Sequence, residues 1–183
     1  MPLLRPTDCG LLIIETVSEL RSEAVTDRQL SRGMTAIRQA AALADVPTHA
    51  ASYHRTGPAS VKPNSATPIE RLHALGPSLV NWADSPLGKA LSNTERASIV
   101  IAGFWLEEAV TFGVLSALGE GYDTYAMFDV MPALNAPTAN LAQQRLIHAG
   151  AVPTITGQVI REWAAHTLDA QKRLAILDTV LNS

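Results

Sequence analysis

The stretch Ser98–Val110, with the sequence SIVIAGFWLEEAV, decides the fold of this chain. It begins with a short, continuous apolar run rich in β-branched residues, which predicts a strand over Ser98–Ala102 that is covered on both faces. Gly103 ends this strand. The apolar residues that follow predict a helix over Leu106–Leu118, buried on several sides, since it is apolar nearly all round. A strand that turns directly into a helix is the building unit of a parallel α/β sheet.

The same alternation extends in both directions along the chain. Further strands are predicted over residues 11–14, 47–53, 122–128 and 151–155. Further helices are predicted over residues 26–44 and 137–149, and over 158–181 as one long helix or two in series. The alternation predicts a three-layer α/β/α fold around a parallel sheet of about six strands in the order 3-2-1-4-5-6. Sites in such folds lie beyond the carboxyl ends of the strands.

Length and composition limit the classes of protein to consider. The 183 residues suit a single domain, with a C-terminal helical extension from about residue 167 that packs on its own domain or on a partner subunit. A hydrophobic fraction of 47% excludes disorder as the main state. The net charge of −3 argues against nucleic acid as a partner. We expect a cytoplasmic protein without a membrane partner, because no signal peptide is evident and no apolar run approaches the roughly 18 residues of a membrane span.

Polar and aromatic residues follow the predicted strands at the edge where a site is expected. Glu15 directly follows the first apolar run, and it is either a general base or a solvated strand end. His54 and Arg55 follow the second strand and either face a pocket or lie in a solvated loop. Other candidates for the pocket surround the turn after Gly103: Phe104, Trp105, Leu106, Glu107 and Glu108. The two aromatic residues also suit the core, and the two acids also suit the first turn of a helix.

The sequence gives no indication of a metal site or another cofactor. Its histidines are scattered and show no ligand spacing: His49, His54, His73, His148 and His166. Cys9 is the only cysteine, so an intramolecular disulfide is impossible. Because Cys9 stands at the entry of the first strand, far from the expected site, we interpret it as a buried, inert thiol rather than a nucleophile.

The order of several segments resembles the isochorismatase-like hydrolases, also called cysteine hydrolases. The resemblance covers roughly residues 8–166 and rests on an ordered set of short segments rather than on one motif. These segments are Asp8–Glu15, Val80–Asp84, Ile99–Gly103, Leu115–Asp123 and the strand-ending Asp129. The resemblance places Trp82 near the pocket.

The catalytic residues of that family are changed in this chain. The family uses an Asp, a Lys and a Cys, and the resemblance assigns Glu15 to the Asp position and Ala109 to the Cys position. No lysine occurs between Lys62 and Lys89, where the family lysine would fall. Alanine has no nucleophile, so the family's covalent mechanism is not expected. The zinc-binding ligands of one branch are also missing.

Three hypotheses follow from this pattern. The first is a catalytically inactive or repurposed homo-oligomer, a pseudoenzyme that binds a small molecule. The second is a hydrolase of a small amide or ester that uses Glu15 to activate water, with N–H groups after Trp105 holding an oxyanion. The third is a structural partner in a mixed assembly with an active relative.

Overall fold

A parallel sheet of six strands forms the centre of the computed structural model, which describes residues 3–16, 28–53, 72–75 and 83–181. The strands are β1 (Cys9–Thr16), β2 (Thr48–Tyr53), β3 (Leu72–Leu75), β4 (Ser98–Gly103), β5 (Asp123–Met127) and β6 (Val152–Thr154). Their order is β3-β2-β1-β4-β5-β6, and every neighbouring pair is parallel. The predicted fold class, strand number and strand order are therefore confirmed.

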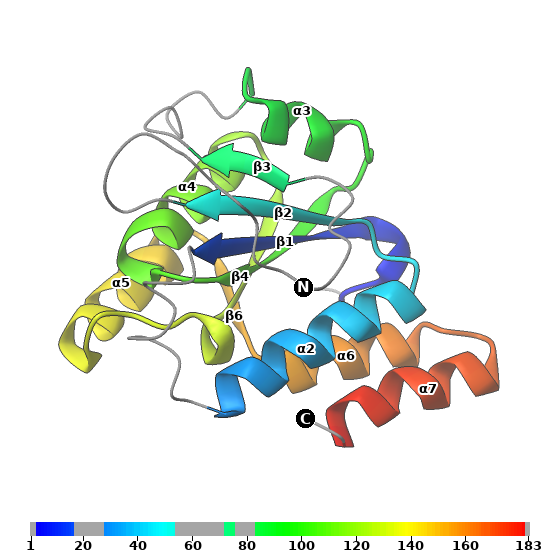
Figure 1. Cartoon of the computed structure of the whole chain (residues 1–183). Coiled ribbons are helices and arrows are strands. Elements are labelled where there is room, and N and C mark those ends of the chain that lie inside the picture. Colours follow the sequence, from blue (N-terminus) through cyan, green and yellow to red (C-terminus); the bar gives the residue numbers. More distant parts are fainter. Residues whose placement is uncertain (1–2, 17–27, 54–71, 76–82, 182–183) are drawn as a thin grey trace.

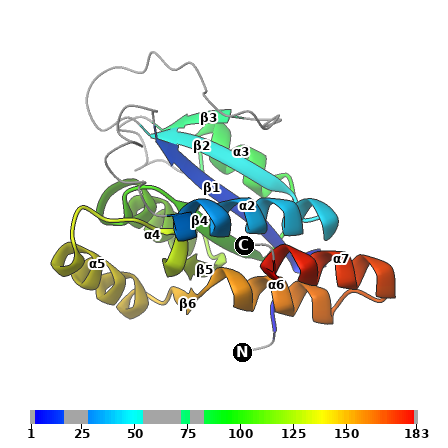
Figure 2. The same cartoon turned by 60° about the horizontal axis from the view of Figure 1, so that its bottom comes forward.

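Helices cover both faces of the sheet (Figure 1). One layer contains α2 (Arg28–Leu43), α6 (Thr156–Ala165) and α7 (Ala170–Leu181). The other contains α3 (Pro86–Ser92), α4 (Thr111–Gly119) and α5 (Ala136–His148). Short η1 (Pro6–Asp8), η3 (Leu106–Val110) and η4 (Phe128–Val130) complete the described elements. Figure 2 shows α2, α6 and α7 side by side, and α7 contacts both of the other two helices.

Alternation along the central strands divides the core into two clusters. In β1, Cys9, Leu11 and Ile13 pack in the cluster beneath α2 and α6, whereas Leu12 and Ile14 pack in the cluster beneath α3, α4 and α5. All five side chains are fully buried. Successive side chains of a strand point to opposite faces, so a strand covered on both sides is apolar at every position. The same alternation assigns Glu15 to the face that α2 covers.

The C-terminal segment forms two helices in series, α6 and α7, which is one of the two predicted alternatives. The other alternative was one long helix. Asp169 begins the second of the two observed helices, because its Oδ1 accepts hydrogen bonds from the backbone N–H groups of Gln171 (2.8 Å) and Lys172 (3.0 Å). These bonds satisfy N–H groups that have no partner within the helix. Ile176 and Thr179 bury one side of α7. None of the helices in the described part of the chain is long and apolar enough to cross a membrane.

Candidate functional site

The candidate site lies where β1 and β4 end side by side. Ile14 of β1 pairs with Gly103 of β4, and the backbone N–H of Phe104 donates to the Ile14 carbonyl over 2.9 Å. A Cβ at Gly103 would lie 2.1 Å from the Ile14 carbonyl oxygen, and Gly103 has a φ of +132°. Only glycine allows the two strands to approach this closely in that conformation.

The turn after Gly103 is strained at Trp105, which has a φ of 67° and a ψ of 74°. A bulky residue in the left-handed region is unusual and costs about 1–3 kcal/mol, and such strain clusters at functional sites. The turn continues as one turn of π-helix, η3, another feature that often marks functional sites. The hydroxyl of Thr111 donates to the Leu106 carbonyl and supports this turn.

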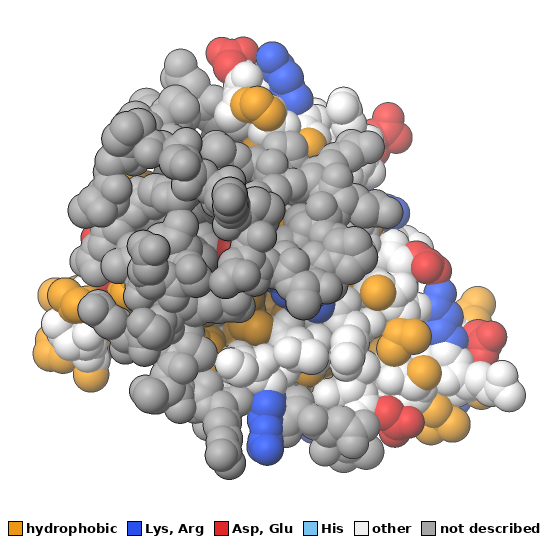
Figure 3. Space-filling model, in the orientation of Figure 1, with side chains coloured by type: hydrophobic (Ala, Val, Ile, Leu, Met, Phe, Trp, Pro, Cys, Tyr) orange, Lys and Arg blue, Asp and Glu red, His pale blue; other side chains and the backbone are white. Residues whose placement is uncertain are grey.

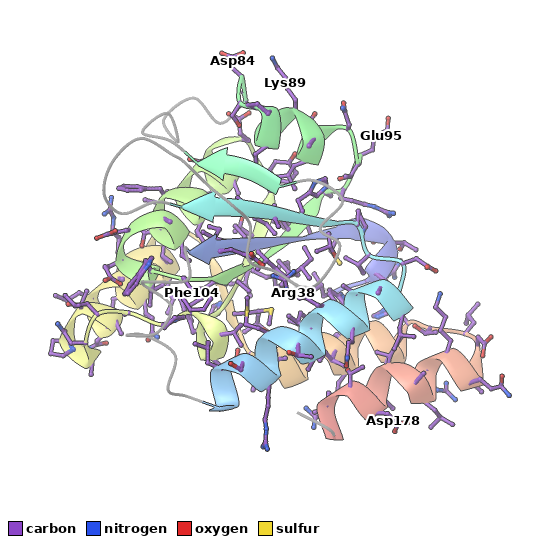
Figure 4. All side chains as sticks on the ribbon, viewed as in Figure 1. Arg38, Asp84, Lys89, Glu95, Phe104 and Asp178 are labelled. Atoms are coloured by element: carbon purple, nitrogen blue, oxygen red, sulfur yellow. The ribbon has the colours of Figure 1, made fainter. Side chains whose placement is uncertain are left out.

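Glu15 is held by Arg38, which the sequence analysis did not single out. Nη2 of Arg38 donates to Oε1 of Glu15 in an ion pair between α2 and the end of β1. The side chains are only 20% and 13% exposed, respectively. Arg38 lies between α2 and the sheet in Figure 4. A signal for it existed in the sequence, because Arg38 falls four residues after the buried Met34 and three before the buried Ala41, on the apolar face of the helix.

The other residues of the turn serve packing and loop attachment. Phe104 and Trp105 are 3% and 4% exposed and pack in the cluster beneath α2. Figure 4 shows Phe104 at the carboxyl end of the sheet. Oε1 of Glu107 accepts a hydrogen bond from the backbone N–H of Leu134 over 3.2 Å, so this acid attaches the turn to the segment before α5. Glu108 is partly buried in the same turn.

The expected oxyanion donors after Trp105 are partly occupied. The N–H of Leu106 donates to the Pro132 carbonyl over 3.0 Å, and the N–H of Glu108 donates to the Trp105 carbonyl over 3.0 Å. These two groups are therefore not available to a ligand in this conformation. The difference arises because the turn is π-helical and these two N–H groups are bonded within the protein, whereas the prediction assumed an open α-helical N-terminus.

Ala109 and the Glu15 carboxylate belong to opposite layers. Ala109 is fully buried in the cluster of Ile14 and Leu106, on the α4 side of the sheet. Arg38 draws Glu15 toward α2 on the other side. The remaining predicted site residues, His54, Arg55 and Trp82, lie outside the described residues. Within the described part of the chain, three or more His, Cys, Asp or Glu side chains nowhere gather in a group that could hold a metal ion.

Two further residues from the sequence analysis have structural roles. Both carboxylate oxygens of Asp129 accept from the N–H of Thr156 at 3.0 Å, so this residue, which lies in η4 just after β5, holds the start of α6. Cys9 is fully buried, and burial, the largest cause, raises the pKa of its thiol to about 12. The interpretation of Cys9 as a buried, unreactive thiol agrees with both observations.

Comparison with known proteins confirms the resemblance at the level of the fold. No family model matches the chain. The probable hydrolase YcaC of Escherichia coli is 36% identical over 70 residues, which span 38% of this chain and about a third (34%) of that relative. The crystal structure of the Escherichia coli YcaC gene product, described as an octameric hydrolase of unknown specificity, superposes with a TM-score of 0.82 at 24% identity, covering 98% of this chain and 89% of that one.

A second solved structure connects the fold to the cysteine hydrolases by name. The cysteine hydrolase from Pseudomonas syringae pv. phaseolicola superposes with a TM-score of 0.74 at 11% identity, covering 91% of this chain and 99% of that one. The chain has the isochorismatase-like fold. At these identities the likeness shows the fold alone, so the reaction of an isochorismatase-like protein has to be argued from the residues of the site.

Proposed function

We propose that this chain is an isochorismatase-like protein that has lost the cysteine-hydrolase reaction and binds a small molecule at the carboxyl ends of β1 and β4. The observation that carries the proposal is the turn after Gly103. It contains the strained Trp105 and one turn of π-helix, features that often mark functional sites, while the position assigned to the nucleophile presents the buried methyl group of Ala109. A methyl group can neither attack a carbonyl nor transfer a proton.

The state of Glu15 supports the loss of the reaction. A general base must accept a proton from the reacting group, and one oxygen of the Glu15 carboxylate is already engaged by the Arg38 guanidinium. Arg38 lies at this edge of the sheet, and its guanidinium has N–H groups besides the Nη2 donor that engages Glu15. We infer that it suits a ligand with a carboxylate or a polarised carbonyl oxygen.

The alternative function is hydrolysis of a small amide or ester by water that Glu15 activates. It is favoured by one observation, the presence of a carboxylate at the end of β1, where sites of this fold class form. The two hypotheses differ in their expected turnover. We expect no hydrolysis of a panel of small amides and esters above the uncatalysed rate. Turnover that disappears in Glu15→Gln, while a variant at the exposed Glu120 keeps it, would establish the alternative.

Access to the turn can be tested with a cysteine placed at the nucleophile position. Ala109→Cys is expected to react with iodoacetamide although Ala109 is fully buried in this conformation, because a binding site at the turn has to admit a small molecule. Ala117→Cys is the matched control, since Ala117 is equally buried but lies eight residues along, roughly 12 Å further on if the intervening turns were regular helix. The wild-type chain should stay unmodified because Cys9 is buried.

Intact-mass spectrometry distinguishes the outcomes of that test. One added acetamide group on Ala109→Cys alone supports an open binding site at the turn. If Ala109→Cys is as inert as Ala117→Cys, the turn is closed and the proposed small-molecule site is wrong.

We also propose that the protein assembles as a homo-oligomer. The octameric description of the YcaC gene product is one support. The other is the apolar surface near α5, where Leu134, Leu141 and Ile147 are 61%, 69% and 44% exposed. Figure 3 shows apolar side chains gathered over α5 at the left of the molecule. Exposed apolar residues concentrated on one part of the surface, here α5 and the segment before it, are typical of a protein interface.

A further inference from the structure

A second cavity lies at the opposite edge of the sheet from the candidate site. Its volume is about 480 Å³, within the range of pockets that hold small molecules. Its lining comes from the segments that enter β1, β2 and β4 and from the connection between α6 and α7. Because the strands are parallel, all of these segments meet at the amino ends of the strands.

The charged groups of this cavity are mainly positive. Arg5, Arg96 and Lys172 line it, and Asp45 is the one acidic residue among the lining residues of the described chain. Lys172 is paired with Asp45 through Nζ and Oδ2. The guanidinium groups of Arg5 and Arg96 are therefore the uncompensated positive charges of the cavity, because neither forms an ion pair or a side-chain hydrogen bond with any described residue. This concentration of positive charge stands out in a chain whose net charge is −3.

Arg96 is the strongest indication of a ligand site in this cavity. Its Nε is buried and has no hydrogen-bond partner among the described residues. A buried donor without a partner costs free energy, and such groups are rare in folded proteins. Because Arg96 lines the cavity, an oxyanion there can pair with its guanidinium, which presents N–H groups in a fork that fits two oxygens, and a small shift of the side chain would bring the buried Nε into that pair.

His166 and Thr167 add polar groups to the same wall. Nδ1 of His166 lies 2.9 Å from the Glu162 carbonyl oxygen, which only accepts hydrogen bonds, so Nδ1 carries the proton of the neutral ring. Nε2 is the ring nitrogen that this bond leaves for a ligand. The hydroxyl of Thr167 donates to the Trp163 carbonyl and keeps its lone pairs as acceptors. Nε2 of His166 and the Thr167 oxygen therefore both accept, and they suit hydroxyl groups on the organic part of a ligand rather than phosphate oxygens.

We propose that this cavity binds a small phosphate monoester, with Arg5 and Arg96 holding the phosphate group. Two unpaired guanidinium groups match the charge of about −1.5 to −2 that a phosphate monoester carries near neutral pH. The remaining space and the apolar lining residues Pro6, Ala44 and Leu168 accommodate an organic group on the ester oxygen. This site is separate from the proposed function and does not depend on it.

Calorimetric titration with inorganic phosphate and with glycerol phosphate at constant ionic strength tests the proposal. We expect saturable binding of both, with the ester binding more tightly, and no response to added chloride. Arg96→Gln should weaken binding at least about tenfold, since it removes a charge-assisted fork. Arg5→Gln should weaken it about threefold, because Arg5 is exposed.

The control variant is Arg173→Gln, an exposed residue of α7 that removes the same charge outside the cavity. Its affinity for phosphate should match that of the wild-type chain. Because Arg5 is exposed, Arg5→Gln is expected to fold even if Arg96→Gln does not. The proposal is overturned if phosphate fails to bind, or if Arg5→Gln and Arg173→Gln bind phosphate equally.

Discussion

Gly103 is the residue on which the close contact between β1 and β4 depends. A methyl group there would overlap the Ile14 carbonyl oxygen at 2.1 Å, and the contacting atom belongs to the backbone of a central strand, which cannot move aside alone. The φ of +132° adds strain for any side chain. The shape of the candidate turn therefore follows from the absence of a Cβ at one position.

Gly103→Ala should lower the free energy of unfolding by more than about 3 kcal/mol, since it combines backbone strain with a clash in the core. Gly119→Ala is the matched control, because a Cβ at Gly119 meets nothing within 4 Å. That variant should change the stability by less than about 1 kcal/mol. Urea unfolding followed by circular dichroism measures both values. Equal losses in the two variants would contradict the proposed role of Gly103.

The proton of the buried Cys9 thiol makes the stability of the folded chain depend on pH. The pKa of this thiol is raised from 9.0 to about 12 in the folded chain, mainly because burial disfavours the thiolate. Above pH 9 the unfolded chain loses this proton while the folded chain keeps it, so the unfolded state binds fewer protons. Stability contributed by the neutral thiol is therefore lost as the pH rises from about 9 to 12.

Urea unfolding of the wild type and of Cys9→Ala between pH 8 and pH 11 tests this assignment. The wild type should lose stability more steeply than Cys9→Ala above pH 9. The raised pKa of Tyr122 affects both proteins alike and cancels in the difference. Burial is the largest of the causes that raise the pKa of Tyr125 and Cys9 is the smallest, so removal of Cys9 changes the slope in the same direction as the loss of the thiol. Parallel pH profiles would show that the thiol does not titrate as described.

At the scale of the elements, the start of α7 depends on the ionised form of Asp169. The two backbone N–H groups that its carboxylate accepts lower its pKa below 3.8, with the bond from Lys172 as the largest cause. The folded chain therefore holds this proton less strongly than the unfolded chain. The resulting stability is present above the ordinary pKa and is lost as the pH falls through the lowered value.

Asp169→Asn should be less stable than the wild type at pH 7, and the difference should shrink below about pH 4 as the wild-type carboxylate becomes protonated. Asp178→Asn serves as the control, because Asp178 lies on the same helix past its first turn. Thermal unfolding at pH 7 and pH 3 gives the comparison. A difference between Asp169→Asn and the wild type that stays constant across this range would exclude the ionised cap.

The elements predicted from apolar runs are present in the structure. The two elements without such runs, β3 and α3, are also present but were not predicted from the sequence. β1, β2, β4, β5 and β6 all lie on predicted strands, because strands buried in a sheet need continuous apolar sequence. β3 has only four residues at the edge of the sheet, and α3 has only seven. Neither is long enough to show a period in the sequence.

The sequence predicts on which face of the sheet Glu15 lies, but it does not predict which residue Glu15 contacts. Alternation along β1 assigns Glu15 to the α2 face, but the partner on that face comes from a helix 23 residues away in the sequence. The π-turn of η3 was also not predictable, since its apolar residues fit an ordinary helical period and the unusual bonding depends on Trp105 and Pro132. Pairings between distant elements are set by tertiary packing, which the local pattern does not contain.

Across the surface of the whole molecule, the exposed apolar residues near α5 favour a subunit interface more than those of α7 do. Leu141 of α5 is accompanied by the exposed Leu134 and Ile147, and the neighbouring α4 exposes Phe112. Near α7, Leu168 and Leu174 are exposed, and Figure 3 shows apolar side chains interspersed with residues of both charges over the lower right of the molecule. Isolated exposed leucines are ordinary on protein surfaces, whereas grouped ones favour an interface.

The wild-type chain should therefore elute as a homo-oligomer in size-exclusion chromatography with light scattering. Leu141→Asp should weaken self-association at least about tenfold, because a carboxylate buried in an apolar interface loses its hydration. Leu174→Asp makes the same change on α7, where the exposed fraction is 60% against 69% for Leu141, and should leave the mass unchanged. A monomeric wild type would refute the homo-oligomer, while dissociation by Leu174→Asp alone would move the interface from α5 to α7.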